Sequence, residues 1–597
     1  MKKDKKTDKK LDDEYLVNYV ISAKKRAKTF RDSFMSDIDE CVEQYNCTHP
    51  EVWKKKEGWQ SKIFIPMAYK NVEVGASMLI KMLLSQKDFY DITGVSEDEE
   101  DLRDALKQFI VHVLQKGNFY NVGALAVKEA CVTSTCFIKT LDVSKGKGDF
   151  TLNFIPRTFH DVLVDPSVAF YWINSRFVID EYEKDIADIL ESDLYIYGEP
   201  HFEELKEGGA NENTNLGEER REILDGINKE GSDKTYKPVS IAEFHGKVKD
   251  PDTQKDVEML LTVANDKYLI QKEIVKEDER PYDVIRVNPN AKQFYGAGLI
   301  KKTRAVSDTA NSVINLWMDN WKLAVHKMVI ASNDGSIDWD TVEIKPGAVW
   351  RGDPNAIQPI DMGMPVDGMA ILSTLDQILQ ETYGISRTAQ GQNTAGADET
   401  LGEVQIKLSR SDNRFLQMAK FIEAEWLGRS ITKIIKYTID KCPQSYVDKI
   451  MGFKEVERNM PVVDALRNVI GMEKKMVRVR KLDIEYLRKN RDIALDFRPI
   501  GISRFMNQSE EQTRYNELLK GVLTNEMLGA MFNIKKVTKR TMQSNGFENI
   551  EDLMNSDDEI NQTVDQAMGK TGQMPNLPTS PTEQQIVTPE LNIGNRQ

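Results

Sequence analysis

The chain has 597 residues, of which 40% are hydrophobic and 29% charged. The length allows about three to five domains, and the composition is that of a globular protein with buried cores, which excludes wholesale disorder. A formal net charge of −14 excludes a general nucleic-acid-binding protein, because such a chain repels phosphate. No apolar run is long enough to span a membrane, and the basic N-terminus lacks the apolar region of a secretory signal. Five cysteines in this length fit a reduced, cytoplasmic protein.

The N-terminal part is predicted to be helical after a mobile basic segment at 1–11. Apolar residues between Leu16 and Ile38 recur in steps of three and four, which predicts a helix over 12–45. Two further helices are predicted over 64–86 and 99–131 from the same periodicity.

The hydrophobic period then changes to two, which predicts strands. Residues 203–234 interrupt this part; they are polar and rich in Gly, Asn and Glu, as in a long surface loop. The predicted strands are 137–143, 150–155, 161–165, 176–183, 239–248, 257–263 and 268–275.

From residue 288 onward the pattern again favours helices. One apolar stripe predicts a helix of about 30 residues ending near 328, followed by a β-rich insert and a second helix over 365–383. A flexible polar segment precedes a long helix that starts at the capping box of Thr400 and Glu403. A mixed segment follows to about residue 500, with a strand at 493–497. Residues 507–556 are predicted to be helical and the remaining tail disordered.

Signatures of catalysis are weak in this sequence. No two of the six histidines have the spacing of a zinc peptidase. Cys131 and Cys136 have no second ligand pair, so they are interpreted as buried core residues. The glycines at 146 and 148 lie between two predicted strands, which favours a hairpin turn over a phosphate loop. We therefore predict no catalytic residue, no metal and no cofactor.

One cluster of acidic residues keeps an enzymatic alternative open. Carboxylates followed by Glu-x-Lys hold a catalytic metal in some nucleases, but here they are closely spaced, and the segment is typical of a turn and a strand. The residues are Asp338, Asp340, Glu343 and Lys345.

The order of elements from residue 296 to 440 resembles the central part of the portal proteins of tailed bacteriophages, the head-to-tail connectors. It combines a helix, a small β insert, a second helix, a polar loop and a long capped helix. Local motifs also resemble the short-tailed-phage branch of that family. These motifs are Lys62-Ile63-Phe64-Ile65-Pro66, Phe159-His160-Asp161, Asp165-Pro166, Asn288-Pro289, Phe294-Tyr295-Gly296 and Pro346-Gly347-Ala348-Val349-Trp350.

The resemblance covers roughly residues 12–556 and implies an α+β portal fold. It implies a wing, two stem helices, a clip between them, a tunnel loop and a crown. The implied boundaries are 12–295 for the wing, 296–328 for stem helix 1, 329–363 for the clip, 364–384 for stem helix 2, 385–399 for the tunnel loop, 400–505 for the long helix with a second wing part, 506–556 for the crown and 557–597 for the tail.

The resemblance also implies a function without enzymatic activity. Family members form a ring of twelve subunits at one capsid vertex, with double-stranded DNA passing through the channel. The implied partners are the terminase motor, tail adaptor or head-completion proteins, the major capsid protein and the scaffold. The implied location is the virion, after assembly in the cytoplasm of the host bacterium, with no membrane contact.

Within this scheme, four groups of residues are candidates for function. The tunnel loop would present Arg387, Gln390, Gln392 and Asn393 to DNA. A basic ring on the stem would contain Lys301, Lys302 and Arg304. Trp317 and Trp321 would pack the stem, and Trp339, Trp350 and Asp353 belong to the clip.

Three of these groups also have a simpler interpretation. The tryptophan stripe is also typical of an ordinary core helix, and the three basic residues are typical of a solvated surface. Arg387 could also be an ordinary loop charge. Two other classes of protein stay open: a metal-dependent DNA-processing enzyme and a capsid scaffold protein that lines no channel.

Overall fold

The structure is a computed structural model of the chain, and it divides into two compact units, residues 1–505 and 506–597. In the second unit, helical residues are described at 515–521, 537–538 and 540–542, within the predicted crown. The described residues are 12–84, 89–93, 100–144, 146, 148–169, 172–208, 238–250, 255–275, 280–325, 329–331, 340, 353, 355, 357–359, 368–383, 414–463, 469–489, 496–499, 515–521, 537–538 and 540–542.

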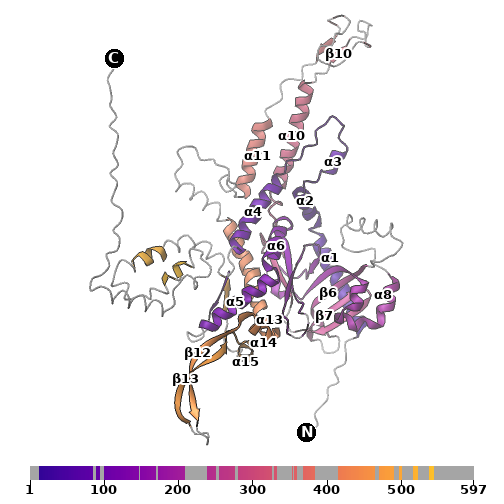
Figure 1. Ribbon diagram of the computed structural model, residues 1–597. Coiled ribbons are helices and arrows are strands. Elements are labelled where there is room, and N and C mark those ends of the chain that lie inside the picture. Colours follow the sequence, from indigo (N-terminus) through magenta and orange to yellow (C-terminus); the bar gives the residue numbers. More distant parts are fainter. Residues whose placement is uncertain are drawn as a thin grey trace, which may run out of the picture. The chain divides into compact units, whose positions relative to one another are not determined.

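The chain begins with helices α1 (Asp13–Asp32), α2 (Met35–Tyr45), α3 (Glu51–Lys54) and α4 (Met67–Leu84) (Figure 1). The prediction of one helix over 12–45 is wrong at its centre, because the helix stops at Ser33 and Phe34. The two halves pack against different cores: α1 covers the larger sheet, whereas α2 contacts α4 and α6. A single straight helix would not bury both halves.

The predicted helix 99–131 is likewise two helices, α5 (Glu100–Lys116) and α6 (Phe119–Thr133). Asn118 adopts the left-handed conformation with φ of 58°. A Cβ atom on Gly117 would lie 2.6 Å from the carbonyl oxygen of Leu152. The chain therefore turns where it passes close to the backbone of the next sheet.

A three-stranded antiparallel sheet has the order β3-β2-β9. It consists of β2 (Thr135–Asp142), β3 (Leu152–Arg157) and β9 (Tyr282–Arg286). The predicted hairpin is confirmed, with Gly146 and Gly148 at positive φ in its turn. Strand β9 was not predicted; all five of its residues are buried, so it shows no alternation.

The larger sheet is antiparallel and has the order β4-β5-β6-β7-β8. The strand predictions here are confirmed, as is the turn at Asn265 and Asp266, both at positive φ. Helix α1 covers one face with Leu16, Val20 and Ala23. The strands are β4 (Val162–Val164), β5 (Phe177–Asp185), β6 (Pro238–Lys249), β7 (Asp256–Ala264) and β8 (Tyr268–Ile274).

The region of the larger sheet also contains short helices that were not predicted. Helix α8 (Phe202–Gly208) occupies the start of the predicted surface loop 203–234; residues 209–237 lie outside the described part. Ile189, Tyr195 and Leu205 pack against the sheet. The other short helices are η2 (Trp172–Asn174), α7 (Ile186–Glu191) and η3 (Asp193–His201).

The next helix, α10 (Arg304–Val325), starts eight residues later than predicted. Residues 299–303 form turns instead. The backbone N–H of Leu299 donates to the carbonyl of Cys131 at 2.8 Å, and Gly298 contacts the same chain end. This anchoring to the end of α6 prevents a continuous helix. Strands β10 (Val329–Ala331) and β11 (Ile357–Pro359) pair beyond α10, and helix α11 (Gly368–Tyr383) is confirmed.

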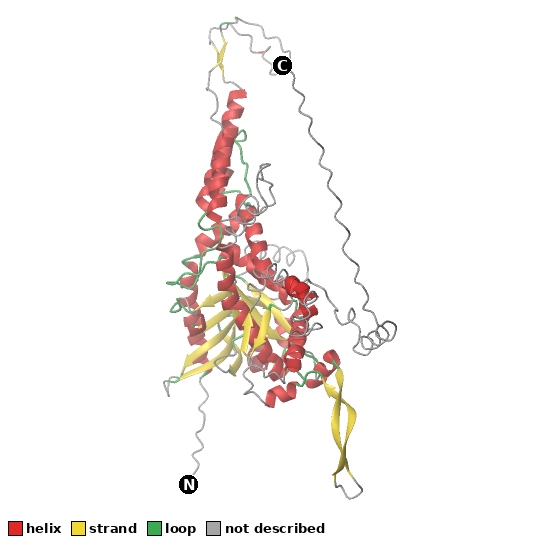
Figure 2. Ribbon diagram, turned by 90° about the vertical axis from the view of Figure 1, so that its left-hand side faces the viewer, coloured by secondary structure: helices red, strands yellow, loops and turns green. Residues whose placement is uncertain are grey.

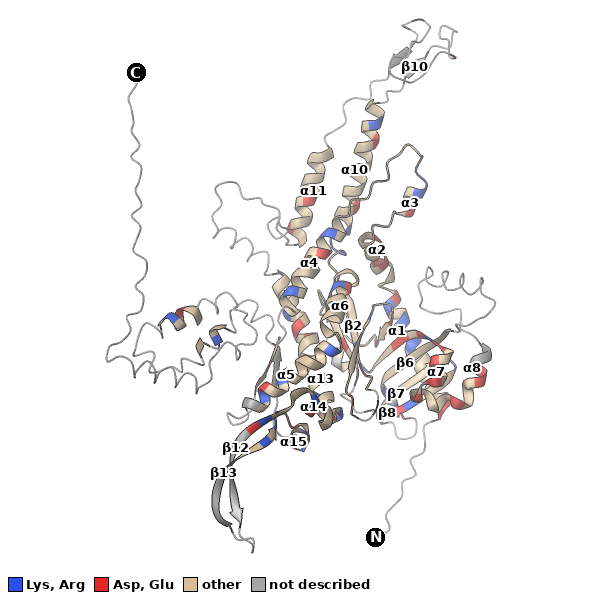
Figure 3. Ribbon diagram, viewed as in Figure 1, with Lys and Arg blue, Asp and Glu red and all other residues tan. Residues whose placement is uncertain are grey.

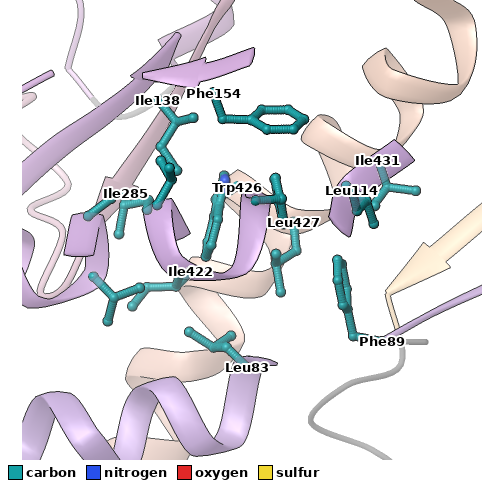
Figure 4. Close-up of a cluster of buried hydrophobic side chains, with 14 of the residues drawn as sticks. Leu83, Phe89, Leu114, Ile138, Phe154, Ile285, Ile422, Trp426, Leu427 and Ile431 are labelled. Atoms are coloured by element: carbon teal, nitrogen blue, oxygen red, sulfur yellow. The ribbon is translucent and has the colours of Figure 1, made fainter. Parts of the chain in front are cut away.

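The long helix predicted from Thr400 is described from Arg414 onward. It includes a π-helical segment, η5 (Glu423–Leu427), and continues as α13 (Gly428–Lys441). Trp426 is fully buried at the centre of the main core, beside Leu427, Ile422 and Phe154 (Figure 4). The Arg286 guanidinium, fully buried in β9, pairs with Glu425, which ties the π-helical segment to the smaller sheet.

The chain then forms α14 (Gln444–Met451), β12 (Phe453–Val463), β13 (Val469–Arg480), α15 (Ile484–Lys489) and β14 (Asp496–Pro499). Strands β12 and β13 pair with each other as a two-stranded ribbon, drawn in yellow in Figure 2. This ribbon was not predicted, because its many charged residues obscure the alternation. Strand β14 pairs with β1 (Tyr90–Thr93) and begins three residues later than the predicted strand at 493–497.

Candidate functional site

Helix α10 buries a row of polar side chains on one face. Ser307, Asn311, Asn315 and Asp319 recur every four residues and are all buried. The apolar stripe of this helix was predicted, whereas this polar row was not. Four short polar residues at a spacing of four were the available signal, since that spacing places them on one helix face.

This polar face binds the extended segment 61–65 through its backbone. The N–H groups of Ser61, Ile63 and Ile65 donate to Asp319 Oδ1 at 2.6 Å, Asn315 Oδ1 at 2.7 Å and Asn311 Oδ1 at 2.8 Å. Asn315 Nδ2 also donates to the carbonyl of Ile63 at 2.9 Å. Two extended residues span about 6.6 Å and four helical residues about 6 Å, so the two repeats stay in register.

Helix α11 packs against a different face of α10. Trp317 is half-buried, and a Cβ atom on Gly368 would lie 2.4 Å from its Cγ. Near the other end of α11, the Thr303 hydroxyl donates to the Tyr383 hydroxyl oxygen at 2.6 Å. Gly368, the first residue of α11, therefore permits a close approach of the two helices.

Large apolar side chains on both helices remain exposed. Trp321 is 50% exposed and Met369 is 57% exposed. A helix pair with so much exposed apolar surface is typical of an element that is completed by another molecule. The other exposed members are Leu316, Val325, Ile371 and Ile378.

A cluster of buried titratable groups lies elsewhere, between the two sheets. Lys139 Nζ donates to Asp180 at 3.0 Å and Glu243 at 2.7 Å, and His245 contacts Glu243 at 2.6 Å. Burial raises the pKa of Glu243, but the hydrogen bond from His245 and the charge of Lys139 outweigh it and hold that pKa well below its ordinary value. Because these groups satisfy one another inside the protein, the cluster has the properties of a structural ionic core.

No group of three potential ligands is arranged for a metal ion among the residues that the structure describes. Of the acidic cluster that suggested a nuclease, Asp340 alone belongs to that part of the chain. Cys131 and Cys136 are fully buried, as predicted, and burial raises the pKa of the Cys131 thiol to about 12.

Comparison with known protein families gives a direct match. The profile of the family described as phage SU10 portal protein matches residues 140–458, which is more than half of the chain. The chain belongs to the phage SU10 portal protein family. The resemblance to tailed-phage portal proteins is thereby confirmed, and the match is consistent with the short-tailed branch. A search of curated proteins found no match.

The matched region of this portal protein includes the larger sheet, strands β3 and β9 of the smaller one, the α10–α11 pair and the π-helical segment. The predicted α+β class is confirmed by the mixture of helices and sheets. The family is one of structural portal proteins, and membership makes the chain a component of the phage capsid. Among the described residues, no helix is long and apolar enough to cross a membrane.

The predicted basic residues lie at the base of α10. Lys301 pairs with Asp37 at 2.8 Å, and Arg304 pairs with Glu40 at 2.7 Å. The hydrogen bond from Lys301 lowers the pKa of Asp37. Two of the three positive charges are therefore shared with carboxylates of α2, while Lys302 is exposed.

The other predicted site residues fall mainly outside the described part of the portal protein. Asp353 is exposed and accepts a hydrogen bond from the N–H of Asn355 at 2.8 Å. The positions that lie outside the described residues are Trp339, Trp350, Arg387, Gln390, Gln392 and Asn393.

Proposed function

We propose that this portal protein forms a closed ring, most favourably of twelve subunits, at one capsid vertex. The ring would be the channel through which the terminase motor packages DNA and through which the DNA later leaves. It would also attach tail adaptor or head-completion proteins and contact the major capsid protein and scaffold. The observation that carries this proposal is the family match over the region that contains the incomplete helix pair.

The predicted domain scheme becomes part of the proposal. Helices α10 and α11 would be the stem, the β10–β11 insert the clip, and residues 385–399 the tunnel loop. The stem explains the exposed apolar residues, because neighbouring copies would cover them. Trp317 packs within one subunit, and Trp321 would contact the next. In the clip, Trp339, Trp350 and Asp353 would contact the motor and the adaptor.

Electrostatics supports passage of DNA without tight binding. Twelve copies of a chain with net charge −14 carry about −168, which disfavours strong phosphate contacts. In the tunnel loop, Arg387 would supply one charge, while Gln390, Gln392 and Asn393 would touch DNA without the salt-dependent attraction of lysines. At the stem base, Lys302 is the best-placed candidate for a phosphate contact, since Lys301 and Arg304 already pair with carboxylates.

Electron microscopy of the purified protein tests this proposal. Ring-shaped particles with a central channel are expected, together with no cleavage of DNA in the presence of Mg²⁺. Metal-dependent cleavage by a monomer would instead favour the nuclease alternative, and compact particles without a channel would favour a scaffold protein.

A further inference from the structure

The segment between α2 and α4, residues 46–66, is fixed on α10; we name it the arm. Besides the three backbone hydrogen bonds to the polar row, Lys322 Nζ donates to the carbonyl of Trp59 at 2.8 Å and to Ser61 Oγ at 2.7 Å. Phe64 contacts the rings of His49 and Trp53 within the arm. Because its conformation is set by these contacts, the arm offers a preformed surface.

The arm and α11 occupy opposite sides of α10. Asn315 lies at the centre of the arm-binding face, and Trp317 on the α11-binding face is two residues later. At about 100° per residue, the two side chains are separated by roughly 160° around the helix axis. Figure 1 shows α3, in the arm, and α11 on either side of α10. The arm of one chain is therefore separated from α11 of the same chain by the width of a helix.

Both outer surfaces expose apolar side chains. On the arm, Val52 is 73% exposed, and Trp59 and Ile63 are also exposed. On α11, Met369 and Ile371 are exposed near the end that packs on Trp317. Each surface is thus suited to bury apolar area against a partner.

The two surfaces carry opposite charge. The arm contains four lysines (Lys54, Lys55, Lys56 and Lys62) and two glutamates, a net charge of +2 within a chain of −14. Helix α11 contains two acidic residues, Asp376 and Glu381, and no lysine or arginine, as Figure 3 shows by its red segments without blue ones. Complementary charge of this kind orients partners and excludes like-charged pairings.

We propose that the arm of one copy of this chain docks on α11 of the neighbouring copy. A head-to-tail contact between two different surfaces of the same chain generates a ring when the rotation closes. Here the order arm, α10, α11 would repeat around the ring, with each basic arm against the next acidic helix. This inference rests on the proposed ring and names the surfaces that close it.

Reciprocal charge reversal tests the docking. The arm variant Lys54→Glu, Lys55→Glu, Lys62→Glu changes exposed side chains only. It should raise the protein concentration needed for half-assembly, measured by sedimentation velocity, on the order of tenfold, because several weak ion pairs become repulsive in every interface. Adding Asp376→Lys and Glu381→Lys on α11 should restore assembly, and wild-type assembly should weaken as salt rises.

A matched control separates docking from general charge effects. The variant Lys25→Glu, Lys255→Glu, Lys292→Glu makes the same change in net charge at exposed positions away from the arm, and it should assemble like the wild type. Equal thermal unfolding of all variants would show that the fold is kept. If the arm variant assembles normally, or if the α11 reversal fails to rescue it, the docking inference is wrong while the ring stands. If wild-type protein forms no ring, the proposed function itself fails.

Discussion

The two-sheet region and the α10–α11 pair differ in which side chains they bury. Between the sheets, even charged groups are enclosed and paired, as Lys139 is with Asp180 and Glu243. On the helix pair, large apolar groups such as Trp321 and Met369 remain exposed. The first region buries its charged groups within one chain, whereas in the proposed ring the second would be completed by neighbouring copies. Substitutions of buried, paired groups should therefore lower stability, whereas substitutions of the exposed apolar groups on the helix pair should lower assembly.

The largest effect is expected in the ionic core. Lys139→Met leaves Asp180 and Glu243 buried with one positive partner fewer, which should cost about 3–5 kcal/mol of unfolding free energy. Denaturant unfolding measures this loss. Lys25→Met, at an exposed position, is the control and should change stability by less than about 0.5 kcal/mol. Equal effects of the two substitutions would contradict the structural role of the cluster.

The same cluster should make stability depend on acid pH. The folded protein holds the pKa of Glu243 below its ordinary value of 4.5, so below that value the unfolded chain binds more protons. The stabilisation of the folded protein by ionised Glu243 is present above pH 4.5 and is lost as the pH falls toward the pKa of the folded state. Between about pH 5 and pH 3, around this ordinary value, the free energy of unfolding should fall less steeply with decreasing pH for Glu243→Gln than for the wild type. If Glu243→Gln leaves the slope of unfolding free energy against pH unchanged, Glu243 is not a source of the pH dependence.

A smaller effect is expected where α10 and α11 meet. In Gly368→Ala, the new Cβ would lie 2.4 Å from Trp317 Cγ and 2.8 Å from its Cβ, so the helices must separate. We expect a loss of about 1–3 kcal/mol, measured by thermal unfolding. Gly58→Ala is the matched control, because nothing lies within 4 Å of its new Cβ. If both variants unfold alike, the close contact is not rigid.

The smallest effect on a single chain is expected at Trp321. Because its ring is half exposed, Trp321→Ser should change unfolding free energy by less than about 1 kcal/mol. Its effect should appear in assembly, as a fall in the sedimenting fraction of large particles. A strong loss of monomer stability would place Trp321 in a core instead.

The regular parts of this fold were predictable because they follow simple periods. The strands β5–β8 are short segments that contain Val, Ile, Phe or Tyr, and α11 repeats its apolar residues at helical spacing, so both were predicted from the sequence. The breaks at Ser33 and Gly117 did not, because they depend on which distant surface each half packs against. Strand β9 is buried on both faces and has no period.

Only the apolar stripe of the candidate site could be predicted from the sequence. The stripe with Trp317 and Trp321 indicated a stem, but the polar row of Asn311, Asn315 and Asp319 resembles a solvated face. Its partner is the backbone of residues 61–65, about 250 positions earlier in the chain. A backbone partner has no side-chain signature, so sequence patterns cannot reveal it.

Native mass spectrometry tests the central claim most directly, since the account requires that the α10–α11 pair be completed by other copies. One chain has a mass of 68.2 kDa, so twelve copies have a mass of about 818 kDa. At micromolar concentration and low salt, we expect a dominant closed species at or near that mass. A single species at 68.2 kDa under the same conditions would contradict the account.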